Sequence, residues 1–231
     1  TVTTPPHDIQ TREVTRYLPD GDGADILRMI MGESSGIITS SQKIKKFREQ
    51  YKGDPESVWL WGGGRRPAME TLNDRFGLTG YTISAVDLIH GIGKAAGLQS
   101  IHVDGATGYL DTNYEGKCAA LAKGLKDGDL VFLHVEAPDE SGHEGSLEHK
   151  VQAVQDFDSK IAGPALEIIK DYDDFVILVM PDHPTPIKIR THTPDAVPFC
   201  LYSSSNLFEV ERNKYHAASY SEKDAAKTGL S

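Results

Sequence analysis

The sequence is poor in cysteine and contains no long apolar run. Its only thiols, Cys118 and Cys200, are too far apart for a CxxC motif and too few for a disulfide framework. We expect both to be small, partly buried residues of a protein from a reducing compartment. No apolar segment approaches the roughly 18 residues that a membrane span requires. The composition therefore argues against a disulfide-stapled secreted protein and against a membrane protein.

The first residues of the sequence lack the pattern of a secretory signal, which is a basic segment followed by an apolar stretch. Together with the cysteine usage, this predicts a cytoplasmic location, unless a leader has been removed.

Positive charge is also scarce, because 24 Lys and Arg stand against 34 Asp and Glu, which gives a net charge of −10. Such a charge repels a nucleic-acid backbone unless a basic patch offsets it. The best candidate patch, with Lys43, Lys45 and Lys46, falls on a predicted helix and is typical of a solvated face. We therefore expect no nucleic-acid partner. An anionic small molecule can still bind where cations and arginines offset the charge locally.

The pattern of the chain is that of an α/β protein with a mostly parallel sheet flanked by helices. Short apolar strands alternate with helices, and 231 residues suffice for one large or two small domains. The expected strands are residues 57–61, 81–86, 101–103, 131–135 and 175–180. The expected helices are residues 24–31, 41–50, 88–96, 114–125 and 147–169, the last being amphipathic.

One glycine-rich segment is a candidate anion site. The expected strand 57–61 leads into Gly62–Gly64, Arg65 and Arg66. Glycine allows backbone N–H groups to approach an anion, and arginine binds phosphate or carboxylate through two hydrogen bonds. The alternative is a plain loop with solvated arginines.

A second glycine-rich segment, GIGK at residues 91–94, resembles a nucleotide-binding loop only superficially. The Walker spacing requires glycine where Leu88 stands and Ser or Thr where Ala95 stands. We therefore reject that interpretation.

Two expected strands end in clusters of aspartate and histidine. Asp139 and His143 follow the first strand, Asp182 and His183 follow the second, and His192 lies ten residues beyond Asp182. The carboxyl ends of strands in an open α/β sheet are where loops gather side chains around one point. A helical turn would place Asp139 and His143 on one face, and a folded-back loop would do the same. The pattern indicates a metal site.

The mixture of carboxylate oxygen and imidazole nitrogen suits Mn²⁺, Zn²⁺ or Fe²⁺ better than Ca²⁺. Five ligands exceed the need of one structural ion and favour a two-metal centre of the kind that clamps the oxygens of phosphoryl transfer. The alternative is a set of solvated loop residues and buried, hydrogen-bonded histidines. Five other histidines are expected to be structural. His134 lies inside an expected strand and His149 on an expected helix, while His90, His102 and His216 show no partner spacing.

The segments HVEAPDESGHEG, DHPTP and RTHTPDAVPF resemble the cofactor-independent phosphoglycerate mutases of the archaeal type, in the alkaline phosphatase superfamily. TPPHDI at 4–9, WLWGGG at 59–64, ISAVDLIHGIG at 83–93 and GATGYLDTNYEGK at 105–117 resemble the same family, so the likeness covers nearly the whole chain. It implies an alkaline-phosphatase-like domain, whose C-terminal part is residues 80–231. Residues 1–79 would be the C-terminal part of an inserted substrate-binding domain.

The resemblance also implies chemistry. The family interconverts 3-phosphoglycerate and 2-phosphoglycerate through a phosphoserine, without 2,3-bisphosphoglycerate, and usually with two Mn²⁺ ions; Zn²⁺, Co²⁺ and Mg²⁺ are the other candidates. The implied ligands are Asp139, His143 and His192 for one ion, and Asp182 and His183 for the other. The implied residues for a small phosphorylated acid are Arg65 and Arg66, and more weakly His7 and Asp8.

Family members carry a strand with a further metal-binding aspartate, followed by the segment that holds the nucleophilic serine. The sequence departs from this pattern, because none of its serines stands in that context. We expect a fragment that is inactive by itself. A phosphatase or phosphonate hydrolase of the same superfamily is the alternative enzyme, and a non-catalytic metal-binding domain is the alternative of another class. The sequence does not predict the oligomeric state.

Overall fold

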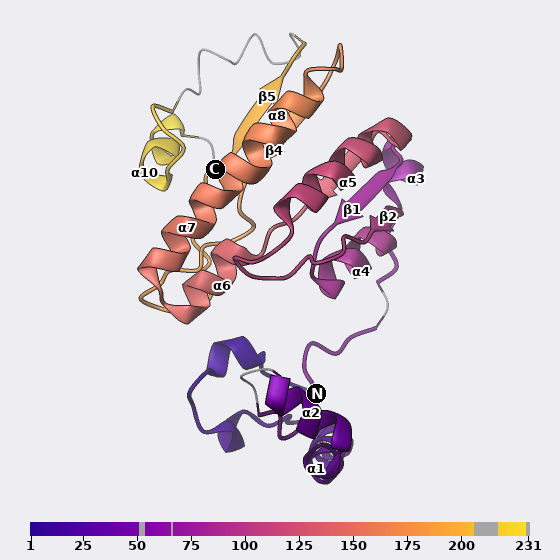
Figure 1. Cartoon of the computed structure of the whole chain (residues 1–231), viewed down its shortest axis with the longest axis vertical. Coiled ribbons are helices and arrows are strands. Elements are labelled where there is room, and N and C mark those ends of the chain that lie inside the picture. The colour runs from indigo at the N-terminus through magenta and orange to yellow at the C-terminus, as the bar shows by residue number, and fades with distance from the viewer. Residues whose placement is uncertain (51–53, 66, 206–216, 230–231) are drawn as a thin grey trace. The chain divides into compact units, whose positions relative to one another are not determined.

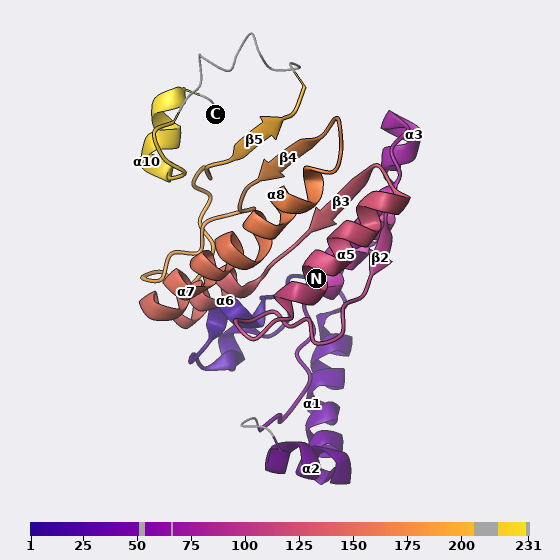
Figure 2. The same cartoon turned by 45° about the horizontal axis from the view of Figure 1, so that its top comes forward.

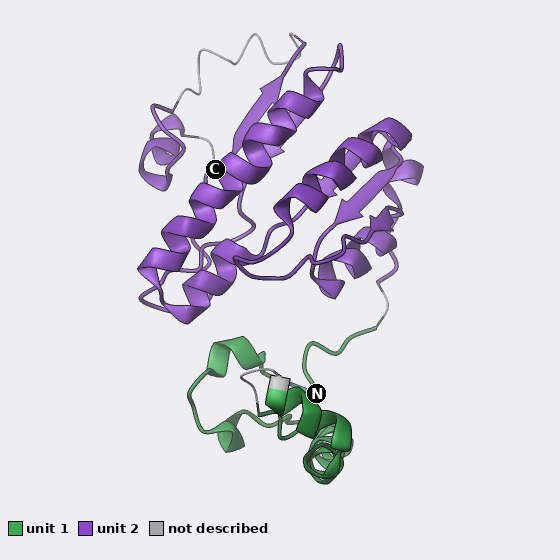
Figure 3. Ribbon diagram, in the orientation of Figure 1, with its two compact units in different colours: residues 1–66 green, residues 67–231 purple. Residues whose placement is uncertain are grey.

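The computed structural model describes residues 1–50, 54–65, 67–205 and 217–229. It forms two compact units, Thr1–Arg66 and Pro67–Ser231 (Figure 3). The division lies before the expected boundary at residue 79, because the intervening residues are bonded to the second unit. The amide of Leu72 donates to the carbonyl of Ala96 at 2.8 Å, and the amide of Thr79 donates to the Asp129 carboxylate at 2.9 Å. The assignment of the two parts to substrate-binding and metal-binding domains remains a prediction.

The first unit is built on two helices, α1 (Ala24–Ser40) and α2 (Gln42–Gln50) (Figure 1). Two short 3₁₀ turns, η1 (Pro6–Ile9) and η2 (Val14–Tyr17), precede them. Helix α1 continues beyond its expected end at Gly32. A glycine inside a helix costs only about 1 kcal/mol, and burial of the neighbouring Met31 on this helix helps to offset that cost.

The expected strand at residues 57–61 is wrong, because this segment forms no β-ladder in the structure. Side chains hold it instead: the indole N–H of Trp59 donates to the carbonyl of Thr4 at 2.8 Å, and the amide of Val58 donates to the Ser34 hydroxyl at 3.0 Å. The glycine-rich segment therefore follows an irregular, partly exposed stretch, which weakens the argument for an anion cradle built on a strand end.

The second unit contains the parallel sheet that the sequence predicts. Strand β1 (Gly80–Ile83) lies between β2 (Gln99–Ile101) and β3 (Leu130–Leu133), and both pairings are parallel. Helices α4 (Asp87–Ala95) and α5 (Tyr114–Asp127) connect these strands, close to their expected positions. A short helix, α3 (Leu72–Phe76), precedes the sheet and begins with a capping box at Thr71.

The two faces of this sheet are covered by different helices, as the alternation of side chains along a strand requires. Ile83 and Val131 belong to the core cluster that includes Ala120 and Leu121 of α5. Thr82 points to the other face, where it meets Gly93 of α4.

A second, smaller ladder stands beside the sheet. Strand β4 (Val176–Val179) pairs antiparallel with β5 (Cys200–Ser203) (Figure 2). Within the described residues, β4 has its ladder partner in β5 and not in β3.

Between β3 and β4 the chain forms α6 (Ala137–Glu144), α7 (Leu147–Phe157), a π-helical segment η3 (Asp158–Ala162) and α8 (Gly163–Ile169). The expected amphipathic helix over 147–169 is present, but only part of its expected apolar stripe is buried. Ala153, Ile161, Ala165 and Ile169 are buried, whereas Leu147, Val151, Val154 and Leu166 are exposed. The described chain ends with α10 (Glu222–Ala225) and η5 (Ala226–Thr228). None of the described helices combines the length and apolar character needed to cross a membrane.

The packing of α4 on β1 can be tested with two glycines of one helix. A Cβ at Gly93 would lie 2.1 Å from the Thr82 hydroxyl oxygen, whereas a Cβ at Gly91 would meet nothing within 4 Å. We expect Gly93→Ala to destabilise the chain by about 1–3 kcal/mol through overpacking. Gly91→Ala should stabilise it by about 0.5–1 kcal/mol through helix propensity. Urea denaturation followed by circular dichroism measures both, and equal effects would contradict this packing.

Candidate metal centre

Helix α6 presents the first two predicted ligands on one face. Pro138 lies in its first turn, where proline needs no amide partner, and Gly145 ends it with a left-handed φ of 76°. Asp139 and His143 are four residues apart, and the His143 Nε2 atom lies 3.2 Å from the Asp139 Oδ2 atom. The structure therefore decides between the two local geometries that the sequence left open, in favour of a helical turn.

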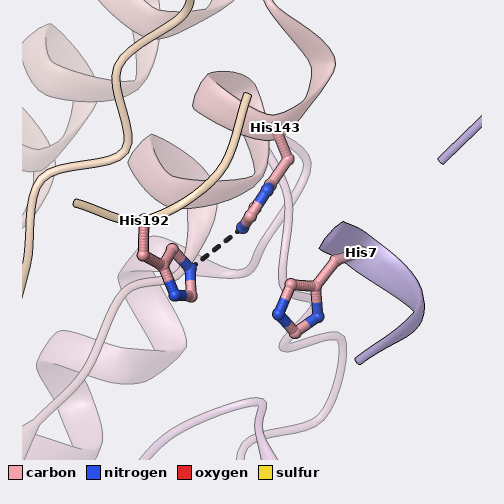
Figure 4. Close-up of side chains that lie close together, drawn as sticks. All are labelled: His7, His143 and His192. Atoms are coloured by element: carbon pink, nitrogen blue, oxygen red, sulfur yellow. Dashed lines mark hydrogen bonds between the residues drawn. The ribbon is translucent and has the colours of Figure 1, made fainter. Parts of the chain in front are cut away.

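The segment after β4 brings two further predicted ligands to this face. The Nε2 atom of His192 lies 3.0 Å from the Nε2 atom of His143 (Figure 4) and 3.4 Å from an Asp139 oxygen. The ring of His183 stacks on that of His192 with 3.7 Å between centroids, and its Nδ1 atom lies 3.9 Å from Asp139. Four donor groups from two segments thus converge on one point.

A hydrogen bond from the ring nitrogen that faces away from the cluster fixes the orientation of His143. Its Nδ1 atom lies 3.0 Å from the carbonyl oxygen of Arg190. A carbonyl only accepts hydrogen bonds, so Nδ1 carries the proton and the lone pair of Nε2 faces the cluster. Arg190 adopts a left-handed φ of 58°, which is uncommon for a side chain of this size. The strained backbone of Arg190 thus supplies the carbonyl that orients His143, an arrangement typical of functional sites.

Asp182 is the most exposed of the five predicted ligands. Its side chain is 68% exposed, and it contacts the imidazole of His183 at 3.4 Å. One of its oxygens also accepts from the amide of His183 at 3.0 Å. The division of the five residues between two ions therefore remains a prediction.

The predicted substrate-binding residues belong to the first unit. Asp8 and His7 lie on η1 with 3.8 Å between Asp8 Oδ1 and His7 Nε2, and the rings of His7 and Trp61 form a T-shaped pair with 5.4 Å between their centroids. Arg65 is exposed. Arg66 lies outside the described residues. The role of these four residues stays a prediction.

Sequence reasoning missed Thr185, which is buried and lies beside the cluster. Its hydroxyl donates to the Oδ1 atom of Asp139, and it also lies 3.3 Å from the Nδ1 atom of His183. The signal was available, because Thr185 stands two residues after His183 in the DHPTP segment. A hydroxyl in that position can fix the orientation of a carboxylate ligand.

Sequence reasoning also missed the acidic surroundings of the cluster. Glu136, Asp139 and Glu140 bring carboxylate oxygens within 4.8 Å of one another. Burial, followed by repulsion from Asp139 and Glu140, raises the pKa of Glu136 to about 7. His134, expected to be structural, lies with its Nε2 atom 3.2 Å from Glu136. Several carboxylates crowded together in this way favour the binding of a cation.

The residues present fit a divalent ion. Imidazole nitrogen and carboxylate oxygen are the donors that Mn²⁺ and Zn²⁺ accept, and the ligand atoms of Asp139, His183 and His192 lie within 4.8 Å of one another. His143 adds a buried nitrogen whose tautomer is already set for coordination.

Comparison with known proteins gives a consistent result. The model of the Metalloenzyme superfamily matches residues 17–226. A 2,3-bisphosphoglycerate-independent phosphoglycerate mutase from Methanosarcina mazei is 50% identical over 200 residues, which are 86% of this chain and 50% of that protein. A probable enzyme of the same name from Geobacter sulfurreducens is 46% identical over 226 residues, 98% of this chain and 55% of that protein. The chain thus spans about half the length of these curated relatives.

Among solved structures, the PH0037 protein from Pyrococcus horikoshii is similar, with a TM-score of 0.62 and 27% identity. The match covers 71% of this chain and 48% of that one.

The raised pKa of Glu136 predicts a pH dependence of stability in the metal-free chain. A carboxyl whose folded pKa is raised contributes stability below its unfolded pKa near 4.5, and loses it as pH rises through about 7. Relative to Glu136→Gln, we expect the original chain to lose roughly 1–2 kcal/mol between pH 5 and pH 8, allowing for partial exposure.

Urea denaturation in EDTA at several pH values measures this difference. Glu144→Gln is the matched control, because hydrogen bonds from Tyr109 and His149 lower rather than raise the pKa of Glu144. If the free energy of unfolding of Glu136→Gln depends on pH in the same way as that of the original chain, the raised pKa of Glu136 is contradicted.

Proposed function

Because this chain belongs to the Metalloenzyme superfamily, we propose that the cluster of Asp139, His143, His183 and His192 is the metal centre of a 2,3-bisphosphoglycerate-independent phosphoglycerate mutase. Such an enzyme interconverts 3-phosphoglycerate and 2-phosphoglycerate. The observation that carries the proposal is the convergence of these four donor groups from α6 and from the segment after β4. The names and identities of the relatives support it.

The chemistry follows from the donor set. Divalent ions held there, by preference Mn²⁺, would neutralise the charge of a transferring phosphoryl group. In-line phosphoryl transfer depends on positioning and charge more than on acid or base strength. Asp139 and His143 meet that need because both stand on one helix. The hydroxyl of Thr185 fixes the orientation of the Asp139 side chain, and the carbonyl of Arg190 fixes that of the His143 side chain.

The acidic surroundings impose an order on binding. Glu136 and Glu140 beside Asp139, in a chain of net charge −10, repel a phosphorylated acid. We therefore infer that cations bind first and create the charge that attracts the substrate. Arg65 and Arg66 are our candidates for holding its phosphate and carboxylate groups, and His7 and Asp8 are weaker candidates for contacting the substrate.

The number of ions can be measured by elemental analysis of the purified chain loaded with Mn²⁺. Asp182→Ala and His183→Ala should each reduce the content from about two ions to about one. His149→Ala is the matched control, since His149 is bonded to Glu144 and is expected to have no metal role. Unchanged Mn²⁺ content in both ligand variants would contradict the proposed second ion.

The reaction can be tested in a chimaera. The 200 matching residues of the Methanosarcina mazei enzyme would be replaced by the corresponding part of this chain. With Mn²⁺ we expect conversion of 3-phosphoglycerate into 2-phosphoglycerate, and a loss of at least about a hundredfold in the same chimaera with His143→Ala. Free phosphate as the main product would favour the alternative, a phosphatase of the same superfamily. A folded, Mn²⁺-loaded chimaera that forms neither product would contradict both enzyme proposals. The 231-residue chain alone is expected to bind ions without turnover.

A further inference from the structure

The backbones of the two segments that carry the candidate ligands approach each other closely at Gly142. A Cβ added to Gly142 of α6 would lie 2.3 Å from the carbonyl oxygen of Thr185. No other residue type fits there without a shift of the backbone, so this glycine allows the turn after β4 to lie directly on α6. Close approach by itself permits the contact but does not hold it.

Lys150 of α7 supplies a direct link between the two segments. Its ammonium group donates to the carbonyl of Pro138, in the first turn of α6, at 2.6 Å, and to the carbonyl of Thr185 at 3.3 Å. Lys150 is partly buried. An ammonium group has three donors, and two of them are committed to these carbonyls, one from each ligand-bearing segment.

The turn that Lys150 holds is bonded internally, so fixing Thr185 fixes its neighbours. The amide of Thr193 donates to the carbonyl of Pro184 at 3.1 Å, and the amide of Arg190 donates to that of Pro186 at 2.9 Å. These bonds close the segment that carries His183 at one end and His192 at the other. The Thr185 hydroxyl also bonds to Asp139.

We propose that Lys150 is a positioning residue of the metal centre. By joining Pro138 to Thr185, it holds His183 and His192 against Asp139 and His143, and it thereby sets the affinity of the cluster for divalent ions. The inference rests on the proposed metal centre, to which it adds a residue that is not itself a ligand.

The test compares Lys150→Met, which keeps the length of the side chain and removes its donors, with Lys170→Met. Lys170 is exposed and pairs with Glu167 on the surface, so it controls for the loss of one positive charge. Mn²⁺ affinity is measured by electron paramagnetic resonance of the free ion. Amide hydrogen exchange of the metal-free chain is measured in parallel, and thermal unfolding shows whether both variants are folded.

We expect Lys150→Met to weaken Mn²⁺ binding by about tenfold or more, the usual effect of losing a partner outside the ligand shell. Amides of residues 182–193 should exchange faster in that variant, and Lys170→Met should change neither quantity. If Lys150→Met does not fold, Lys150→Gln, which retains donors on a shorter side chain, takes its place with the same expected direction.

Two results would overturn the proposal: Mn²⁺ binding as tight as in the original chain or tighter, or unchanged exchange of residues 182–193. If the original chain binds no Mn²⁺, the proposed metal centre is wrong. The exchange measurement, which needs no metal, still decides whether Lys150 holds the turn.

Discussion

The arrangement of the candidate metal centre depends on the contact between α6 and the turn around Thr185. Gly142 lets the two backbones meet, and the Thr185 hydroxyl reaches the carboxylate of Asp139 across that contact. The two segments are separated in sequence by α7, η3 and α8, so the ligands are neighbours only because this helical segment returns the chain to β4. A small displacement of the turn would separate the imidazole of His192 from that of His143.

Much of this could be predicted from the sequence, because periodicity and local signals suffice for it. The i,i+4 spacing of Asp139 and His143, the strands that end in polar clusters and the alternation of helix and strand are all local patterns. The failures also have physical reasons. Gly32 does not end α1, since a glycine inside a helix costs little, and residues 57–61 have no ladder partner in the described structure.

The contributions of Lys150 and Arg190 were not predictable in the same way. Lys150 donates a hydrogen bond to a backbone carbonyl, and Arg190 contributes its own backbone carbonyl as an acceptor. A carbonyl is present at every residue, so such a contact leaves no trace in residue type or spacing. The raised pKa of Glu136 is likewise a product of folding. Glu136, Asp139 and Glu140 form an ordinary acidic run in the sequence, and it is burial together with mutual repulsion that raises this pKa. Ligand candidates can thus be named from sequence, whereas contacts made through backbone carbonyls and the effects of burial cannot.

The π-helical segment between α7 and α8 explains how residues of both helices come to be buried on the same side. In η3 the amide of Gly163 bonds to the carbonyl of Asp158, five residues back. One extra residue in a turn rotates everything beyond it by about 100° relative to a continuous α-helix. Ala153 of α7 and Ile169 of α8 are both buried, although a continuous α-helix would place residues sixteen positions apart about 160° from each other. The extra residue reduces this angle to about 60°, so the two helices bury their small and apolar residues on one side of a single helical segment.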